Sequence, residues 1–185
     1  MKTVRILFSV SALAVLSLCF SCKEKPVSTD IIVKERVPEK VKTGTQRMDD
    51  SSASTTVDWV GSSYTVDVLR TADTSLPAVD DGTGTKYYDN GVQVRIIRKD
   101  GSEFFNRTFT KKDFESYLDK GYADQSVLQA IVCLEAEGDN VVFTVSVGSP
   151  DVMSDEYMLL TMRVSRMGTV SVSKETREDD EEDDF

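Results

Sequence analysis

The sequence predicts an α+β domain, built as a mainly antiparallel β-sheet of six to seven strands with one short helix packed on it. Two observations predict this class. Short segments alternate between apolar and polar residues with a period of two, and turn signals such as Lys99-Asp100-Gly101 separate them. Tight turns join antiparallel neighbours, whereas parallel strands need long crossover connections. A pure β-sandwich is the alternative arrangement of the same strands.

The first half of the domain reads as strands joined by turns. Asp89-Asn90-Gly91 and Lys99-Asp100-Gly101 are turn signals, because Asn-Gly and Asp-Gly supply the positive φ angles of tight hairpins. The expected elements, in order, are a strand over 64–70, a loop over 72–85, a strand over 92–98 and its hairpin partner over 102–109.

One helix is predicted over residues 111–120. Thr110 and Asp113 have the spacing of a capping box, with Asp in place of the usual Glu, and Gly121 is expected to end the helix. Residues 124–126 are expected to cap one further helical turn. The apolar side chains that would share one face of the helix are Phe114, Tyr117 and Leu118.

The second half of the domain alternates with the same period of two. Gly138-Asp139-Asn140 separates a strand over 130–137 from one over 141–147, which indicates a third hairpin. A further strand over 156–166 is followed by a turn at Met167-Gly168 and a last strand over 169–173. In the strand over 141–147 the alternate residues Val141, Phe143, Val145 and Val147 are all apolar, which predicts that one face is buried.

Residues 1–21 read as a targeting segment. Lys2 and Arg5 precede an uncharged apolar stretch over 6–20, whose roughly 22 Å as a helix is too short to cross a bilayer. The stretch ends in Ser21-Cys22, which resembles the lipobox of bacterial lipoproteins, where a small residue precedes the cysteine that is acylated. Cys22 is therefore the expected lipidation site, and acyl chains such as palmitate on it would anchor the chain to a membrane. The alternative is an ordinary cleaved signal peptide with two incidental cysteines.

The remaining chain divides into three parts. Residues 22–56 are rich in Lys, Glu, Ser and Thr and predict a flexible tether. Residues 57–176 form the expected folded domain, and residues 177–185 form an acidic tail that we expect to be disordered and solvated, with cation binding as the alternative.

Charge and composition limit the chemistry. Removal of Lys2 and Arg5 leaves 22 − 2 = 20 basic against 32 acidic residues, so nucleic acid is not an expected partner. The absence of histidine excludes His-dependent triads and the usual zinc sites, and we expect no cofactor and no metal. Cys133 lies in an apolar run and is expected to be a buried small hydrophobe rather than a nucleophile.

The sequence offers few candidate sites. Two aromatic pairs form the candidate binding surface. Neighbouring residues of a strand point to opposite faces, so one ring of each pair is expected to face the core. The other ring is expected to be covered by the protein's own helix, and a ring that is left uncovered would form an apolar binding surface. The loop over 80–85 is expected to be a connector, although its oxygens could hold a cation. Three carboxylates, Asp113, Glu115 and Asp119, are expected to be solvated and not catalytic. The two aromatic pairs are Tyr87 with Tyr88 and Phe104 with Phe105.

Several short stretches of the domain are similar to uncharacterised small lipoproteins of anaerobic Gram-negative gut bacteria, which are catalogued as domains of unknown function. The stretches are Trp59 to Tyr64, Tyr87 to Asn90, Phe104 to Phe114 and Val147 to Asp151. The resemblance implies an address in the cell envelope and adds no active site.

We therefore expect a lipid-anchored cell-envelope protein, at the outer membrane on its periplasmic or surface face. Its domain is expected to be a noncatalytic binding or structural module, with a protein, peptide or glycan as its partner and the membrane contacted through Cys22. A small hydrolase that needs no histidine, or an enzyme inhibitor, is the alternative.

Overall fold

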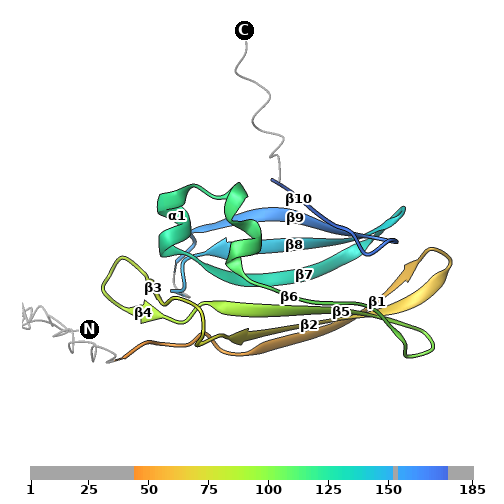
Figure 1. The fold of residues 1–185 in the computed structure, drawn as a ribbon, viewed down its shortest axis with the longest axis horizontal. Helices are drawn as coiled ribbons and strands as arrows, with labels where there is room; N and C mark the ends of the chain where they lie inside the picture. The colour runs from red at the N-terminus through yellow and green to blue at the C-terminus, as the bar shows by residue number, and fades with distance from the viewer. Residues whose placement is uncertain (1–43, 152–153, 175–185) are drawn as a thin grey trace, which may run out of the picture. The chain divides into compact units, whose positions relative to one another are not determined.

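The computed structural model of the protein describes residues 44–151 and 154–174, and this part of the chain is predominantly β and mostly antiparallel (Figure 1). The predicted signal segment 1–21, the predicted lipidation site Cys22 and the predicted acidic tail 177–185 lie outside the described residues. None of the helices in the described part is long and apolar enough to cross a membrane.

The first sheet is built from one continuous stretch of the chain and has the strand order β1-β2-β5-β6. Every neighbouring pair is antiparallel. A two-stranded ribbon of β3 and β4 lies in the connection between β2 and β5. The bounds are β1 Ser51–Trp59, β2 Ser62–Ala72, β3 Val79–Asp80, β4 Lys86–Tyr87, β5 Asn90–Arg98 and β6 Glu103–Phe109.

The second sheet follows along the chain and has the order β10-β9-β8-β7, again with antiparallel neighbours. Its hairpin turns contain Gly138 with φ 54° and Gly168 with φ 75°, conformations that glycine adopts without strain. The turn signals at these two places are confirmed. The bounds are β7 Val127–Glu137, β8 Asn140–Gly148, β9 Tyr157–Ser165 and β10 Val170–Lys174.

The two sheets pack face to face around one core, as Figure 1 shows. The inner strands β5, β8 and β9 alternate for most of their length, so their apolar side chains point mainly inward. The central core side chains are at most 1% exposed, and burying each contributes about 1.5–3 kcal/mol relative to exposure. They are Val66, Val92, Val94 and Ile96 from the first sheet, with Val141, Phe143, Val145, Leu160, Met162 and Val164 from the second.

Two short helical segments connect the sheets: a 3-10 helix η1 over Lys111–Tyr117 and the α-helix α1 over Lys120–Gln125. Phe114 of η1 is fully buried and stacks on Phe109, with 6.0 Å between ring centroids. η1 contacts β10, and side chains of β6, η1 and β10 line one groove. η1 therefore lies between these two edge strands. The helical segments therefore close one side of a β-sandwich.

The α+β expectation overstated the helical part. The predicted helix over 111–120 is a 3-10 helix that ends at Tyr117, and Gly121 lies within α1 instead of ending a helix. The capping interaction is present: the Asp113 carboxylate accepts hydrogen bonds from the Thr110 backbone N–H at 2.9 Å and from its hydroxyl at 3.3 Å. Phe114 is fully buried in the core. In a helical segment this short, such tertiary packing outweighs the local sequence pattern that predicted an α-helix.

Two further expectations were wrong in detail. The domain was expected to start at Val57, but β1 begins at Ser51 and pairs with β2 along its whole length. The stretch 51–56 has almost no apolar residue, so its composition is typical of a linker. An edge strand with one solvent-facing side nevertheless needs few apolar residues. Asp89-Asn90-Gly91 is not a hairpin turn: Asn90 begins β5, and both Asp89 and Asn90 are buried.

Candidate functional site

The candidate aromatic surface does not form at Phe104 and Phe105. A β-bulge sets Ile96 opposite Phe105 and Ile97 opposite Glu103, so Phe104 is the extra residue. Both rings pack against the core, with Phe104 edge-on to Trp59 at 5.2 Å and Phe105 stacked on Phe109 at 6.4 Å. The prediction that the two rings point to opposite faces is wrong because a bulge interrupts the alternation of side chains.

Tyr87 is the last residue of β4 in the small ribbon, and Tyr88 follows it. Both are half-buried, and the Tyr88 N–H donates to the Gln46 carbonyl at 2.9 Å. Burial raises the pKa of Tyr87 above its ordinary value, and the negative charges of Asp81 and Asp151 add to this effect. Tyr87 precedes the start of β5, whereas Phe104 lies beside Arg98 at its end, so the length of β5, roughly 27 Å, separates the two pairs.

The loop over 80–85 uses its carboxylates to hold its own backbone. Asp80 accepts a hydrogen bond from the Gly82 N–H at 2.9 Å, and Asp81 accepts one from the Thr83 N–H at 2.8 Å. Burial pushes the pKa of Asp81 upward, but hydrogen bonds from Thr83 and Thr85 outweigh it, so the pKa lies below its ordinary value. In residues 44–151 and 154–174, no three His, Cys, Asp or Glu side chains gather as metal ligands would.

The three carboxylates of the helical region do not converge on one site. Asp113 caps η1 and forms an ion pair with Arg107 at 2.5 Å, while Glu115 and Asp119 are exposed. Cys133 is half-buried against the core, and burial raises its pKa to about 11. Its neighbours Val132 and Leu134 are 52% and 55% exposed, so the apolar run around Cys133 is only partly covered.

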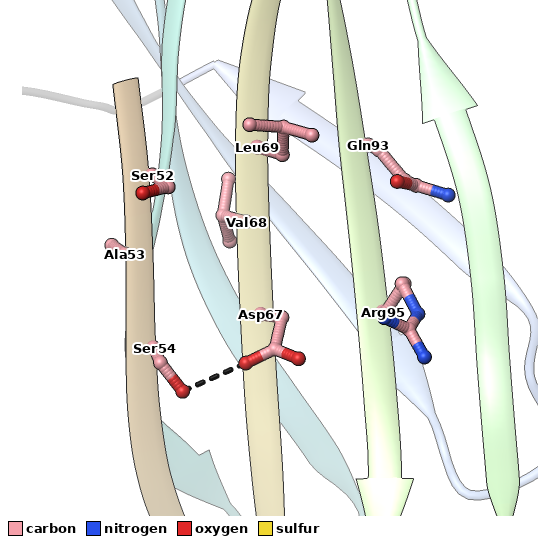
Figure 2. Close-up of a pocket in the computed structure, with 8 residues that line it drawn as sticks. All are labelled: Ser52, Ala53, Ser54, Asp67, Val68, Leu69, Gln93 and Arg95. Carbon is pink, nitrogen blue, oxygen red and sulfur yellow. Dashed lines mark hydrogen bonds between the residues drawn. The ribbon is translucent and has the colours of Figure 1, made fainter.

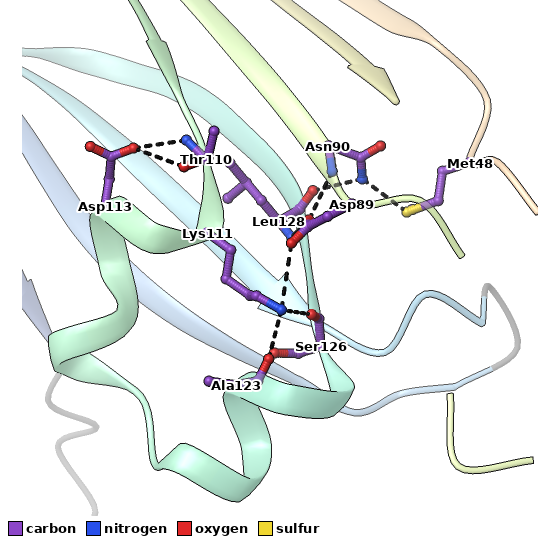
Figure 3. Close-up of polar contacts among 9 residues, drawn as sticks. All are labelled: Met48, Asp89, Asn90, Thr110, Lys111, Asp113, Ala123, Ser126 and Leu128. Atoms are coloured by element: carbon purple, nitrogen blue, oxygen red, sulfur yellow. Dashed lines mark hydrogen bonds and ion pairs between the residues drawn. The ribbon is translucent and has the colours of Figure 1, made fainter. Parts of the chain in front are cut away.

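A buried ion pair joins the two sheets near α1 (Figure 3). The Lys111 ammonium lies 3.5 Å from the Asp89 carboxylate. The other oxygen of Asp89 accepts hydrogen bonds from the backbone N–H groups of Asn90 at 2.8 Å and Leu128 at 2.9 Å. Lys111 also donates to the carbonyls of Ala123, at 2.6 Å, and Ser126. One pair of charges therefore ties together the start of β5, the start of η1, the end of α1 and the start of β7.

This ion pair is a structural element. An ammonium has three N–H groups, and Asp89, Ala123 and Ser126 account for all of them. The Asn90 side chain adds a hydrogen bond to the Leu128 carbonyl at 2.9 Å. Buried charges are tolerated when each is paired and hydrogen-bonded, and this pair meets that condition. Lys111 and Asp89 thus have little capacity left for a ligand.

A shallow groove of about 350 Å³ crosses the outer face of the first sheet (Figure 2). Cross-strand register places Ser54, Asp67 and Arg95 in one row and Ser52, Leu69 and Gln93 in the next. Residues directly opposite each other on one face are in side-chain contact range, so each row is a unit. The groove thus combines hydroxyl, amide, carboxylate and guanidinium groups with one exposed aliphatic side chain.

The polar groups of the groove also interact with one another. The Ser54 hydroxyl donates to Asp67 at 2.7 Å, and the Gln93 amide donates to Asn106 at 3.0 Å. Arg95 forms an ion pair with Glu103 at 3.3 Å, with both side chains more than 40% exposed. Such exposed pairs are weak, about 0–1 kcal/mol, so a polar ligand can exchange for them at low cost. We take this groove as the candidate binding site.

Sequence reasoning missed both the ion pair and the groove. The outward positions Asp67, Leu69, Gln93 and Arg95 follow from the period of two, but their side-by-side placement depends on the register between β2 and β5. The pairing of Asp89 with Lys111 could not be predicted, because the sequence around Asp89 is typical of a turn. The backbone groups that complete the pair, at Ala123, Ser126 and Leu128, lie far along the chain.

Comparison with known protein families gives one match. The model described as domain of unknown function (DUF4738) matches residues 31–172. No curated protein matches the chain. The match covers most of the chain and begins before the predicted tether ends, so the family unit includes residues that the composition assigns to a linker. The chain belongs to the DUF4738 family.

Proposed function

We propose that the chain is a lipid-anchored cell-envelope protein whose β-sandwich is a noncatalytic binding module. The observation that carries this proposal is Ser21-Cys22, placed directly after an uncharged apolar stretch that is too short to span a bilayer. Two or more acyl chains at Cys22 hold a protein durably at a membrane. We place it at the outer membrane, on the periplasmic or surface face.

The groove on the outer face of the first sheet is the proposed binding surface. Its Ser, Gln, Asp and Arg side chains offer both donors and acceptors, and the opposite charges of Asp67 and Arg95 lie in register. A mixed, nearly neutral set of this kind suits a polar ligand such as a glycan or an extended peptide. The net charge of −10 disfavours a nucleic acid as the partner.

Acylation is tested by Cys22→Ser, with Cys19→Ser as the matched control, because the two cysteines lie three positions apart in the same segment. Cells grown with a clickable palmitate analogue are fractionated, and the label and the membrane-bound share of the chain are measured. We expect Cys22→Ser to lose the label and leave the membrane fraction, and Cys19→Ser to keep both. Label and sedimentation that survive Cys22→Ser would contradict the anchor.

Binding by the groove is tested on glycan and peptide arrays with the detergent-solubilised full chain. Asp67→Ala and Gln93→Ala each remove a polar group from the groove, and we expect either to weaken a ligand that the wild type retains. Thr161→Ala, on the outer face of the second sheet, is the control and should bind as the wild type does. A ligand retained equally by all three variants would exclude the groove as its site.

A small histidine-independent hydrolase is a second candidate, favoured by a cavity of about 380 Å³ between residues 76–79 and the two helical segments. Asp89, Glu115 and Asp124 line it together with Lys111 and Lys112. Paired carboxylates can act as acid and base. Hydrolysis of envelope glycans or peptides that Glu115→Gln and Asp124→Asn both abolish would favour this candidate over the binding module.

A further inference from the structure

Among the residues that the structure describes, β1 is a sheet edge with little of the usual protection against pairing. Natural edge strands avoid pairing with other chains through bulges, lysines, prolines or short length. In the described residues, the three other edges of the two large sheets have such features: β6 has a bulge, β7 has two register shifts, and β10 has five residues and ends in Lys174. β1 has nine residues in unbroken register with β2, contains neither proline nor lysine, and has Asp58 as its one charged residue.

The hairpin between β1 and β2 shows which backbone groups are free. Trp59 and Ser62 flank a two-residue turn of Val60 and Gly61, with φ angles of 48° and 74°. The pair that flanks such a turn is hydrogen-bonded, and hydrogen-bonded and non-hydrogen-bonded pairs alternate from there. The residues whose N–H and C=O groups point away from β2 are therefore Ser52, Ser54, Thr56 and Asp58.

These outward groups are self-complementary. Two antiparallel copies of β1 related by a twofold axis at Thr55 would pair Ser54 with Thr56 and Ser52 with Asp58, with about eight backbone hydrogen bonds. No acidic residue then faces another acidic residue. Moving the axis to Ser54 sets Asp58 opposite Asp50, and moving it to Thr56 shortens the paired segment. One register thus combines full length with the absence of like-charge contacts.

We propose that this domain forms a dimer with a second copy of itself by antiparallel pairing of β1, which joins two four-stranded sheets into one of eight strands. Val60, in the turn at the end of β1, is 54% exposed and would lie at the end of the new interface. The pairing does not depend on acylation or on the groove.

Disulfide cross-linking of the full chain in the producing cells reads both the pairing and its register. Thr55 would lie on the axis in a non-hydrogen-bonded pair, where the two Cα atoms are about 4.5 Å apart, within the range of a disulfide. We expect Thr55→Cys to give a covalent dimer on a non-reducing gel after mild oxidation. Ser54→Cys and Thr56→Cys should not, because their own copies would lie roughly 8–9 Å apart. The wild type controls for its own cysteines.

A second pair of variants separates pairing from chance collision. Ser54→Pro in the Thr55→Cys chain removes an outward N–H and leaves the hydrogen bonds between β1 and β2, so the dimer should disappear. Ser54→Ala loses the same hydroxyl but keeps the N–H, so the dimer should remain. Ser54→Lys adds a charge to the edge and should reduce the dimer as well. Equal cross-linking at all three positions, none at Thr55 above the wild type, or a dimer that survives Ser54→Pro would overturn the proposal.

Discussion

The buried pair of Asp89 and Lys111 gives the sharpest stability prediction. Asp89→Ala leaves the backbone N–H groups of Asn90 and Leu128 without their acceptor and takes the counter-ion from Lys111. Breaking a buried ion pair from one side costs about 3–5 kcal/mol. The Lys111 side chain is 18% exposed and keeps two carbonyl partners, so we expect the low end, about 3 kcal/mol.

Urea unfolding followed by tryptophan fluorescence measures this loss directly. Trp59 is the only tryptophan of the chain and is 2% exposed, so its emission reports unfolding of the core. With a slope of about 2 kcal/mol/M, a loss of about 3 kcal/mol lowers the urea midpoint by about 1.5 M and leaves the slope unchanged. Asp50→Ala is the matched control, because its ion pair with Arg47 is exposed, at 4.0 Å, and should shift the midpoint little.

A double variant shows how much of the loss is due to the unpaired charge. Lys111→Met together with Asp89→Ala removes both charges, and we expect it to cost less than the sum of the single variants. If Asp89→Ala shifts the midpoint no more than Asp50→Ala does, the ion pair does not tie the sheets together and the reasoning fails.

Further expected outcomes concern Phe114, two glycines and Cys133. Phe114→Ala removes the ring that closes one side of the sandwich and should cost about 3–5 kcal/mol in the same urea assay, whereas Tyr157→Ala, at a 53% exposed ring, should cost far less. Gly121→Ala should stabilise the domain by about 0.5–1 kcal/mol, because Gly121 is helical and its added Cβ meets no atom within 4 Å. Gly148→Ala should instead destabilise it, since its Cβ would lie 2.4 Å from the Glu156 carbonyl oxygen. Burial raises the Cys133 pKa from 9.0 to about 11, so its labelling by Ellman's reagent at pH 8 should be roughly a hundredfold slower than that of a free thiol. The raised pKa favours the neutral thiol in the folded state, so this contribution to stability is present below about pH 9 and lost as the pH rises through 11.

The strands with one buried face could be predicted from the sequence. In β8, alternate valines and Phe143 face the core, and the turns that contain Gly101, Gly138 and Gly168 mark the hairpins. β1 could not be predicted in the same way. Its Ser and Thr residues carry no apolar signal, and the strand exists because β2 offers a pairing edge. The alternation of apolar and polar residues predicts a strand only where one face of that strand is buried.

The sites depend on contacts between distant parts of the chain. The bulge at Phe104 brings both rings of the pair against the core, and no pattern within β6 marks it. The groove needs the register of β2 with β5, and the ion pair needs the chain reversal that brings Lys111 to Asp89. Period and turn residues determine which way a side chain points, whereas its neighbours are set by the tertiary fold.

Each large sheet comes from one uninterrupted half of the chain, residues 51–109 and 127–174, and a single crossover through η1 and α1 joins them. A cut between these two helical segments would therefore leave every strand pairing within its own fragment. Reassembly of the two fragments would depend on face-to-face packing and on the hydrogen bonds that cross the cut, from Lys111 to the Ala123 and Ser126 carbonyls and from the Leu128 N–H to Asp89. The domain thus offers a natural split point at Leu118-Asp119, where fragment complementation would report the affinity of one sheet for the other.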